Sequence, residues 1–305
     1  MNTPNNTAPD WIAVDWGTTH LRAWAMSNAG EVLGTATSAD GMSKLTASTF
    51  EPALLRIISD WLTDGEITPV VSCGMVGSRQ GWVEAAYQTA PCQPITNAPL
   101  ARAKTTDARI AFFVVPGIKQ NSPADVMRGE ETQIAGLLAQ EPDFDGVACL
   151  PGTHTKWVRI SAGEVVHFTT YLTGELFSLL SSKSVLRHSI SQNGWDATAF
   201  KDSIDDAITK PSTIAARLFL LRSEALISDL SPDTARARLS GYLIGLELGA
   251  ARQYWLGQKV VIIGEEIISD AYYNALSAQG WPPEKYDTQL MTLAGISSAY
   301  LQIKQ

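Results

Sequence analysis

Two short segments of the chain combine glycine and threonine in tight turns, a pattern suited to binding phosphate. The first is Gly17-Thr18-Thr19, which follows an apolar run that begins at Trp11. The second is Gly152-Thr153-His154-Thr155-Lys156, which follows another apolar run. Because glycine lets a ligand approach the backbone closely, the amides and hydroxyls of such turns can face phosphate oxygens. We therefore predict that both turns bind phosphates.

Asp15 closes the first apolar run, whereas Leu150 stands at the matching place before the second turn. An acid at the end of an apolar strand is costly to bury unpaired. A carboxylate is also a suitable oxygen ligand for Mg²⁺ through water. We predict that Asp15 serves Mg²⁺, the alternative being an ordinary turn residue. The two turns are then not equivalent, and one would hold the metal and the transferred phosphate.

A third segment, Ser78-Arg79-Gln80-Gly81-Trp82, follows a buried strand and a Gly-x-x-Gly turn. Loops at this position in an α/β sheet often bind ligands. A substrate carboxylate would suit Arg79 and nearby amides, and Trp82 would form an apolar wall. Ser78 is a further candidate substrate-binding residue. Simple solvation of Arg79 is an equally good interpretation of the local sequence.

Ser122-Pro123-Ala124-Asp125 has the composition of a helix start, with serine before the helix and proline at its first position. The pattern predicts a helix from Ser122 to about Gln140. On local sequence, Asp125 is then a capping carboxylate that opposes the helix dipole. Arg128 would share its helical face and could orient it, contact a phosphoryl oxygen or form an ordinary surface ion pair.

Two similar series of strands would position the two glycine-threonine turns. The predicted strands are residues 11–16, 21–26 and 31–36 in the first series and 146–150, 156–160 and 165–168 in the second. An Ala-Gly-Glu-Val turn occurs at matching places, at 29–32 and at 162–165. A repeat of such long spacing favours two similar domains, with a boundary near 142–146.

Apolar spacing predicts that helices and further strands follow each series. The expected helices are 49–64, 174–183, 212–228, 234–255 and one from Gly264 to about Ala278, and the further strands are 68–73, 110–115 and 259–263. Strands followed by helices in each half indicate an α/β fold with mixed sheets.

Composition limits the classes of partner. The chain has 305 residues, 45% of them hydrophobic, and a net charge of −8. An acidic chain is a poor match for nucleic acid or an anionic membrane, and we expect neither as a partner. No apolar stretch is long enough to cross a bilayer. Residues 1–10 are polar and lack the features of a signal peptide, so we expect a disordered leader and a cytoplasmic protein.

Several other kinds of site are not indicated. The cysteines Cys73, Cys92 and Cys149 are widely spaced and odd in number, which favours reduced cytosolic thiols. The four histidines show no metal-ligand spacing. Neither a GxxxxGK[ST] loop nor a GxGxxG fingerprint occurs, so phosphate would need a different cradle.

The ordered set of motifs resembles a known family. The segment from Val14 to Arg22 resembles the first phosphate loop of the actin/hexokinase/Hsp70 ATPase superfamily, and the segment from Leu150 to Lys156 resembles its second. With the stretches 72–82 and 125–133, the chain more narrowly resembles the 2-dehydro-3-deoxygalactonokinase family. This resemblance covers the chain from about residue 11 to its end.

The resemblance implies an α/β fold of two RNase H-like domains, about 11–145 and 146–305, with the nucleotide in a cleft between the domains. It implies that ATP with Mg²⁺ phosphorylates the C6 hydroxyl of 2-dehydro-3-deoxy-D-galactonate and gives ADP. The first domain would hold the sugar acid and the second the adenosine. Because kinases of the superfamily place a base carboxylate in the first domain, the resemblance favours Asp125 as the base, with Arg128 beside it.

The nucleotide residues that the resemblance implies lie in the two turns and after one later strand. They are Gly17, Thr18, Thr19, Gly152, Thr153, His154, Thr155, Lys156 and Gly264. The adenosine motif of the superfamily usually shows paired glycines after a strand, whereas here Glu265 and Glu266 follow Gly264.

Two other functions remain open at this stage. Another small-molecule kinase of the superfamily, such as a pantothenate or amino-sugar kinase, would share both turns and differ in the acceptor loop. A non-catalytic actin-like nucleotide switch would bind ATP in the same turns but would need a partner surface. The oligomeric state is also open, with a homodimer as one option.

Overall fold

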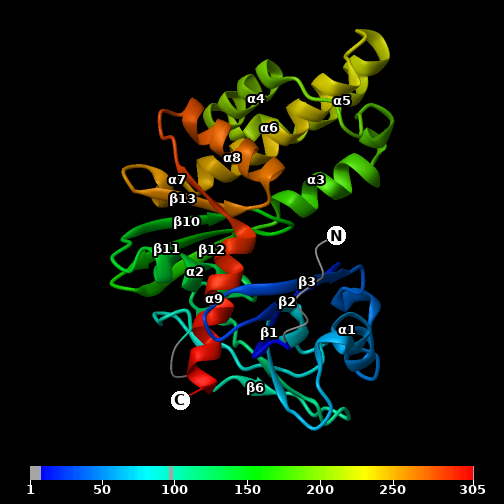
Figure 1. The fold of residues 1–305 in the computed structure, drawn as a ribbon. Coiled ribbons are helices and arrows are strands. Elements are labelled where there is room, and N and C mark those ends of the chain that lie inside the picture. The colour runs from blue at the N-terminus through cyan, green and yellow to red at the C-terminus, as the bar shows by residue number, and fades with distance from the viewer. Residues whose placement is uncertain (1–7, 96–98, 305) are drawn as a thin grey trace, which may run out of the picture. The chain divides into compact units, whose positions relative to one another are not determined.

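The structure is a computed structural model that describes residues 8–95 and 99–304, and these form two compact units (Figure 1). Within the described residues, unit 1 comprises 8–144, 162–167 and 288–304. Unit 2 comprises Asp145–Ser161 and Phe168–Asp287. Each unit combines strands with helices, as the sequence predicts.

The main sheet of unit 1 has the order β3-β2-β1-β4-β7-β6. Its strands are β1 (Trp11–Trp16), β2 (Leu21–Met26), β3 (Val32–Ser38), β4 (Thr68–Gly74), β6 (Ala101–Arg102) and β7 (Ile110–Val114). β1, β2 and β3 are antiparallel neighbours, while β4 and β7 continue the sheet in parallel with β1. A small second sheet has the order β5-β8-β9, formed by β5 (Gln88–Thr89), β8 (Ile118–Asn121) and β9 (Ala124–Met127).

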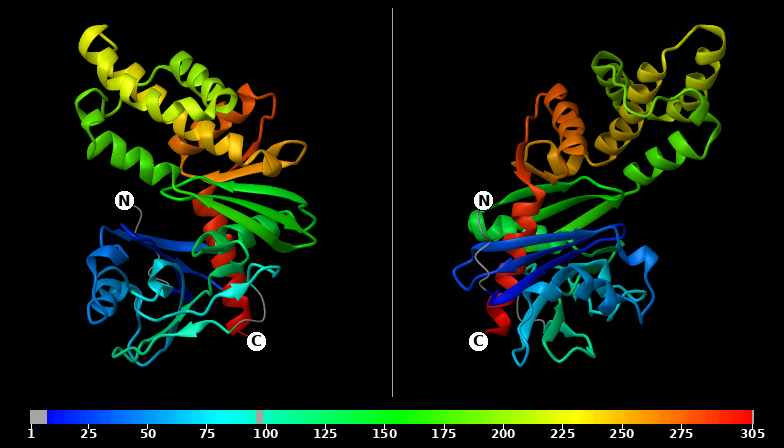
Figure 2. Two further views of the ribbon diagram at one scale, coloured as in Figure 1. Left: turned by 180° about the vertical axis from the view of Figure 1, so that it is seen from behind. Right: turned by 45° about the vertical axis from the view of Figure 1, so that its right-hand side comes forward.

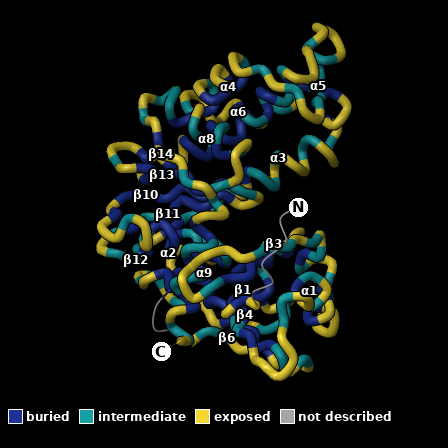
Figure 3. Tube along the Cα trace, in the orientation of Figure 1, coloured by how far each residue is buried: buried dark blue, intermediate teal, exposed yellow. Residues whose placement is uncertain are grey.

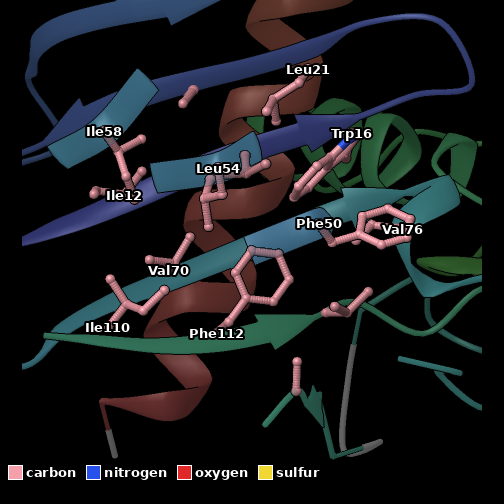
Figure 4. Packing of buried hydrophobic residues seen from close by; sticks show 14 of the residues in the cluster. Ile12, Trp16, Leu21, Phe50, Leu54, Ile58, Val70, Val76, Ile110 and Phe112 are labelled. Carbon is pink, nitrogen blue, oxygen red and sulfur yellow. The ribbon is translucent and has the colours of Figure 1, made fainter. Parts of the chain in front are cut away.

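One face of the main sheet is covered by α1 (Phe50–Ile58). Its apolar residues Phe50, Leu54 and Ile58 are completely buried against side chains from the strands. Figure 4 shows Ile58 near Ile12 and Phe50 near Trp16. Apolar spacing in the sequence predicts this helix, because residues one turn apart must share the buried face.

The other face of this sheet packs against the final helix of the chain. α9 (Thr288–Ile303) contacts β1, β4 and α2 (Glu130–Gln140), and Figure 2 shows it in red. The rings of Trp11 and Tyr300 stack with centroids 4.3 Å apart. A side chain at Gly136 would meet the backbone of Met291, so the two helices are in close contact. Unit 1 is therefore closed by the last segment of the chain.

The second sheet repeats the topology of the first. Its order is β12-β11-β10-β13-β14. The strands are β10 (Gly146–Leu150), β11 (Thr155–Ser161), β12 (Glu164–Tyr171), β13 (Val260–Gly264) and β14 (Glu284–Asp287). β10 pairs antiparallel with β11 and parallel with β13, which in turn pairs parallel with β14. The predicted repeat of the strand series is confirmed.

Six helices of unit 2 lie between or after these strands in the described chain. They are α3 (Thr173–Ser182), α4 (Ala197–Thr209), α5 (Ile214–Ile227), α6 (Pro232–Ala250), α7 (Arg252–Trp255) and α8 (Glu266–Ala278). α4 and α6 pack tightly, since side chains at Gly241 and Gly245 would collide with α4. Figure 3 shows the strand β10 and parts of α6 buried and the connecting turns exposed. Short 3₁₀ turns are η1 (Met42–Lys44), η2 (Ser59–Trp61), η3 (Met75–Gly77), η4 (Val185–His188) and η5 (Pro211–Thr213).

Two segments differ from the expected division of the chain at residue 145. α9 belongs to unit 1, because its apolar residues are buried against the first sheet. Residues 162–167 are also counted with unit 1, where Val165 exchanges backbone hydrogen bonds with Cys92. The order of the sequence alone does not predict that either of these segments packs with unit 1.

The expected helix from Ser122 to Gln140 is wrong in its first part. Residues 118–127 form a hairpin of β8 and β9, which turns at Ser122 and Pro123. The helix α2 begins only at Glu130, after Gly129 with a φ of 107°. Because only glycine adopts such a φ easily, Gly129 marks the change from strand to helix.

Three further observations concern the whole described chain. The cysteines Cys73, Cys92 and Cys149 are free thiols. Within residues 8–95 and 99–304, no helix is both long and apolar enough to cross a membrane. The expected disordered leader, residues 1–10, lies mostly outside the described residues.

Candidate active site

The first glycine-threonine turn joins β1 to β2 and is supported from behind by η1. The amide of Gly17 donates to the carbonyl of His20 at 3.0 Å. The amides of Met42 and Ser43 donate to the carbonyls of Gly17 and Thr18, each at 3.0 Å. Thr18 and Thr19 are exposed. The turn is thus held by its carbonyl groups and presents its threonines at the surface.

Asp15 lies at the end of β1, directly before this turn. Its side chain is 29% exposed, and its Oδ2 lies 4.0 Å from Nη1 of Arg22. The thiol of Cys73 lies 3.9 Å from Oδ1, and burial, with the nearby charge of Asp15, raises the pKa of that thiol. Gly74 has no side chain, and a Cβ there would lie 3.6 Å from Oδ1. The carboxylate is therefore partly exposed and lies beside the backbone of Gly74.

The beginning of α2 lies against the end of β4 in the same unit. A side chain at Gly129 would come within 3.4 Å of the Cα of Gly74. Glu131 is completely buried, and its two oxygens accept hydrogen bonds from the amide of Gly129 at 2.9 and 2.7 Å. Burial raises the pKa of Glu131 to about 8, and the neighbouring Glu130 adds to the effect. Glu131 therefore fixes the backbone of Gly129, the residue directly before α2.

The second glycine-threonine turn joins β10 to β11 and contacts the first turn of α3. The amide of Glu175 donates to the carbonyl of Thr153 at 2.9 Å, and the side chain of Glu175 pairs with His154 at 2.5 Å. A side chain at Gly174 would collide with the carbonyl of Gly152. The positive end of the α3 dipole thus lies beside this turn, an arrangement that favours an anion.

The last two residues of the second motif point into the protein. Thr155 is completely buried, and its Oγ1 lies 2.8 Å from the hydroxyl of Tyr272. Lys156 is 7% exposed, so its side chain is largely shielded from solvent. The exposed part of the motif comprises Thr153 and His154, with Gly152 partly exposed.

A buried carboxylate connects the elements around the second turn. Glu247 on α6 accepts hydrogen bonds from Trp157 Nε1 at 2.7 Å, from the hydroxyl of Tyr272 at 2.7 Å and from Thr173 Oγ1. These donors come from β11, α8 and α3. Burial raises the pKa of Glu247 to about 7, against the three hydrogen bonds, which lower it. The network links four elements of unit 2, namely β11, α3, α6 and α8.

A pocket of about 560 Å³ opens within unit 2 beside the second turn. Gly152 and Thr153 form one part of its lining, and the start of α3 adds Thr173 and Gly174. The rest of the lining comes from α3, α6, α8 and the segment before α4, namely Phe177, Trp195, Arg236, Ser240, Leu243, Ile244, Ile267, Ile268, Asp270, Ala271, Tyr272 and Asn274. The pocket combines apolar walls with a polar edge, as small-molecule sites do.

Arg236 supplies a positive charge to this pocket. Its guanidinium lies 5.1 Å from the centre of the Phe177 ring, and Nη1 donates to the carbonyl of Ser191 at 3.1 Å. Burial lowers the pKa of this guanidinium. The pocket thus offers an aromatic ring, a cation and the positive end of α3.

Gly264 ends β13 next to the second turn. A side chain there would lie 2.9 Å from Cγ of Pro151 and 2.9 Å from Oγ of Ser269. The glycine therefore allows β13 and α8 to approach the turn closely. Gly264 contacts the residue that precedes Gly152, and it is not one of the residues that line the pocket.

The predicted acceptor loop follows β4 and η3 in unit 1. Ser78 is 6% exposed, whereas Arg79 is exposed. The ring of Trp82 lies 4.4 Å from that of Phe112 and packs against the core around Phe50. Trp82 is thus chiefly part of the hydrophobic core, and Ser78 and Arg79 differ sharply in exposure.

Asp125 and Arg128 do not share a helical face, because the hairpin replaces the predicted helix. Asp125 lies on β9, partly exposed, and its Oδ1 accepts from the amide of Val126 at 2.7 Å. The interpretation of Asp125 as a helix cap is therefore wrong. Arg128 lies beyond the end of β9 and is 9% exposed.

Comparison with known proteins identifies the family. The family model described as 2-keto-3-deoxy-galactonokinase matches residues 15–299. The chain belongs to this family. The protein of Rhizobium meliloti (strain 1021) named probable 2-dehydro-3-deoxygalactonokinase is 34% identical over 299 residues, which cover 96% of this chain and 97% of that one. The 2-dehydro-3-deoxygalactonokinase of Escherichia coli (strain K12) is 32% identical over 274 residues, covering 88% and 90%.

Solved structures agree with membership of the 2-keto-3-deoxy-galactonokinase family. A crystal structure from Sinorhizobium meliloti, named as a candidate 2-dehydro-3-deoxygalactonokinase, superposes with a TM-score of 0.87 at 34% identity and covers 96% of each chain. Component A of the (R)-2-hydroxyglutaryl-CoA dehydratase of Acidaminococcus fermentans gives a TM-score of 0.54 at 11% identity, covering 97% of this chain and 99% of that one. The second likeness concerns the fold alone. The expected α/β fold of the actin-like ATPase type is confirmed.

The structure brings together residues that the sequence motifs do not contain. The pocket walls come from helices that are far apart in the sequence, and Arg236, Phe177 and Tyr272 belong to no recognisable motif. Glu247 shows a weak signal, since an acid interrupts an apolar stretch of a helix. Such an acid in a buried helix indicates a hydrogen-bonded network.

Proposed function

We propose that this member of the 2-keto-3-deoxy-galactonokinase family transfers the γ-phosphoryl group of ATP to the C6 hydroxyl of 2-dehydro-3-deoxy-D-galactonate. The observation that carries the proposal is the nearly full-length match to two relatives named as 2-dehydro-3-deoxygalactonokinases. The pocket beside the second turn supports a nucleotide as one ligand. The products are the 6-phosphate and ADP.

Each turn, within its own unit, offers groups that suit the phosphates of a nucleotide. The pocket of unit 2 takes the adenosine, because its apolar walls suit a base and its edge is formed by Gly152 and Thr153. Gly17, Thr18 and Thr19 of unit 1 keep their proposed role as phosphate-binding residues. His154 pairs with Glu175 and so orients the turn. Thr155, Lys156 and Gly264 are buried or tightly packed, and they support the turn from behind.

Asp15 suits a Mg²⁺ ion that accompanies ATP. Its carboxylate is partly exposed and lies beside Gly74 at the end of β4. Mg²⁺ commonly uses one or two protein carboxylates and keeps water and phosphate oxygens as its other ligands. When bound, the ion supplies positive charge that neutralises the phosphates. Among the described residues, no group of three or more His, Cys, Asp or Glu side chains is arranged to hold a metal.

Asp125 is the proposed base, and Glu130 is the competing carboxylate. In the reaction, the C6 oxygen forms a bond to the γ-phosphorus as the bond from that phosphorus to the bridging oxygen of ADP breaks, and the hydroxyl proton moves to the carboxylate. Asp125 is partly exposed on β9. Glu130 is also partly exposed, and its Oε2 accepts from the amide of Arg128 at 3.0 Å. Glu131 is too deeply buried to meet a substrate.

An acceptor screen tests the proposed function. Purified protein, ATP and Mg²⁺ are incubated with a panel of sugar acids, pantothenate and amino sugars, and ADP release is followed with a coupled assay. The proposal predicts the highest kcat/KM with 2-dehydro-3-deoxy-D-galactonate. A higher value for pantothenate or an amino sugar would favour another kinase activity. ATP binding without turnover of any acceptor would favour a nucleotide switch.

A further inference from the structure

Unit 1 contains a group of buried side-chain donors that lack hydrogen-bond partners. Among the described residues of that unit, the buried atoms of this kind are Ser78 Oγ, Gln88 Nε2, and Nε and Nη1 of Arg128. A buried donor without a partner costs about 1–3 kcal/mol, and a charged one costs more. Two of these residues lie close together, because Nη1 of Arg128 is near Gly77, the residue before Ser78, and such donors indicate a place that receives acceptor groups from a ligand.

Arg128 is the charged member of this group. Nη2 donates to the carbonyl of Ala85 at 2.7 Å, and Cζ lies 4.3 Å from the centre of the Tyr87 ring. No carboxylate pairs with this guanidinium in the part of the chain that the structure describes. A buried guanidinium without a counter-ion is unusual, because charges taken out of water are normally paired.

Close contacts bring Arg128 next to the acceptor loop. A side chain at Gly77 would lie 2.9 Å from Nη1 of Arg128 and 2.7 Å from Val114, at the end of β7. Ser78 follows Gly77 directly, and both lie just beyond the end of β4. The group therefore lies at the carboxyl ends of two parallel strands, where α/β sheets bind ligands.

We propose that Arg128, together with Ser78, binds the carboxylate of the sugar-acid substrate, an inference that rests on the proposed function. The guanidinium supplies the positive charge and unpaired N–H donors, and Ser78 supplies a hydroxyl donor. A carboxylate matches these groups in charge and accepts several hydrogen bonds. The ring of Tyr87, 38% exposed, stacks on the guanidinium from one side.

This assignment differs from the prediction that Arg79 binds the carboxylate. Arg79 is exposed, and an exposed cation gains little from an anion because water screens the interaction. At Arg128 the same contact is shielded from water and is worth more. Arg128 therefore decides whether the protein prefers an acid over a neutral sugar.

The test compares the sugar acid with its neutral amide as acceptors for the wild type, Arg128→Gln, Ser78→Ala and Arg79→Ala. Arg102→Gln is the matched control, because that guanidinium also stacks on a ring, Phe113, but is exposed. We expect the wild type to favour the acid by about 100-fold in kcat/KM and Arg128→Gln to favour it by less than about 10-fold. The KM for ATP should change less than about twofold.

Three outcomes would overturn the proposal. The wild type could use acid and amide equally, Arg128→Gln could keep the full preference, or the preference could disappear in Arg79→Ala instead. Wild-type turnover of the acid tests the proposed function separately, so a failure at Arg128 alone leaves that function intact. If Arg128→Gln does not fold, the affinities of the acid and of the amide are measured by calorimetry for the wild type and for Ser78→Ala. These affinities then decide whether the proposal holds. Loss of the acid preference in Ser78→Ala supports the proposal, and equal binding of both ligands to the wild type contradicts it.

Discussion

Replacement of Glu247 by glutamine should change how the stability of the protein depends on pH. Burial raises the pKa of this carboxyl to about 7 from the ordinary value of 4.5. Between these values the folded protein binds the proton more tightly than the unfolded chain. The resulting stabilisation is complete below about pH 4.5 and is lost as the pH rises through about 7. The difference between the two pKa values corresponds to about 3 kcal/mol.

Glutamine removes the titration and can keep most of the hydrogen bonds. Its amide oxygen can accept from Trp157, and its NH₂ group can donate to Thr173 and Tyr272, because hydroxyl groups can rotate to accept. We therefore expect a folded variant that loses about 1 kcal/mol through imperfect geometry. The test therefore relies on how the free energy of unfolding changes with pH, and not on this constant loss of stability.

Urea unfolding followed by tryptophan fluorescence at pH 5, 6, 7 and 8 measures the effect. The free energy of unfolding of the wild type, minus that of Glu247→Gln, should fall by about 2–3 kcal/mol from pH 5 to pH 8. The other titratable groups are the same in both proteins, so their contributions to the pH dependence cancel in this difference. Asp202→Asn, an exposed carboxylate on α4 of the same unit, is the control and should show no such trend. A constant difference for Glu247→Gln would refute the reasoning.

Three further predictions concern catalysis and the core. Asp15→Asn should leave the circular dichroism spectrum unchanged and lower kcat strongly, and near wild-type turnover at saturating Mg²⁺ would contradict the metal role. Asp125→Asn should lower kcat by about 100-fold or more without changing the Tm; if Glu130→Gln alone has this effect in the same assay, Glu130 is the base. Tyr300→Ala should lower the free energy of unfolding by about 3 kcal/mol in urea titrations, because the ring is buried, whereas the exposed Leu301→Ala should cost less than about 1 kcal/mol.

Local patterns in the sequence predict the strands and turns that carry the phosphate site. The runs that end at Asp15 and Leu150 are short and apolar, and each has a glycine two residues further on, so they specify strand and turn without help from distant residues. The two sheets then form with the same topology. The position of Asp15 and the exposure of Thr18 and Thr19 follow from this local order.

Other parts of the fold depend on contacts that no local pattern shows. Ser122-Pro123 fits a helix start as well as a hairpin turn, and only the pairing of β9 with β8 decides between them. α9 follows unit 2 in sequence but is buried against unit 1. The burial of Arg128 likewise depends on contacts with Gly77 and Ala85, residues more than 40 positions away.

The identity of the product tests the central claim most directly. The purified protein is incubated with ATP, Mg²⁺ and 2-dehydro-3-deoxy-D-galactonate, and the reaction is followed by ³¹P NMR without proton decoupling. Transfer to the C6 hydroxyl predicts a new phosphate-ester signal split by the two protons of a CH₂ group, formed in equal amount with ADP. ADP accompanied only by inorganic phosphate, or an ester coupled to a single proton, would contradict the account.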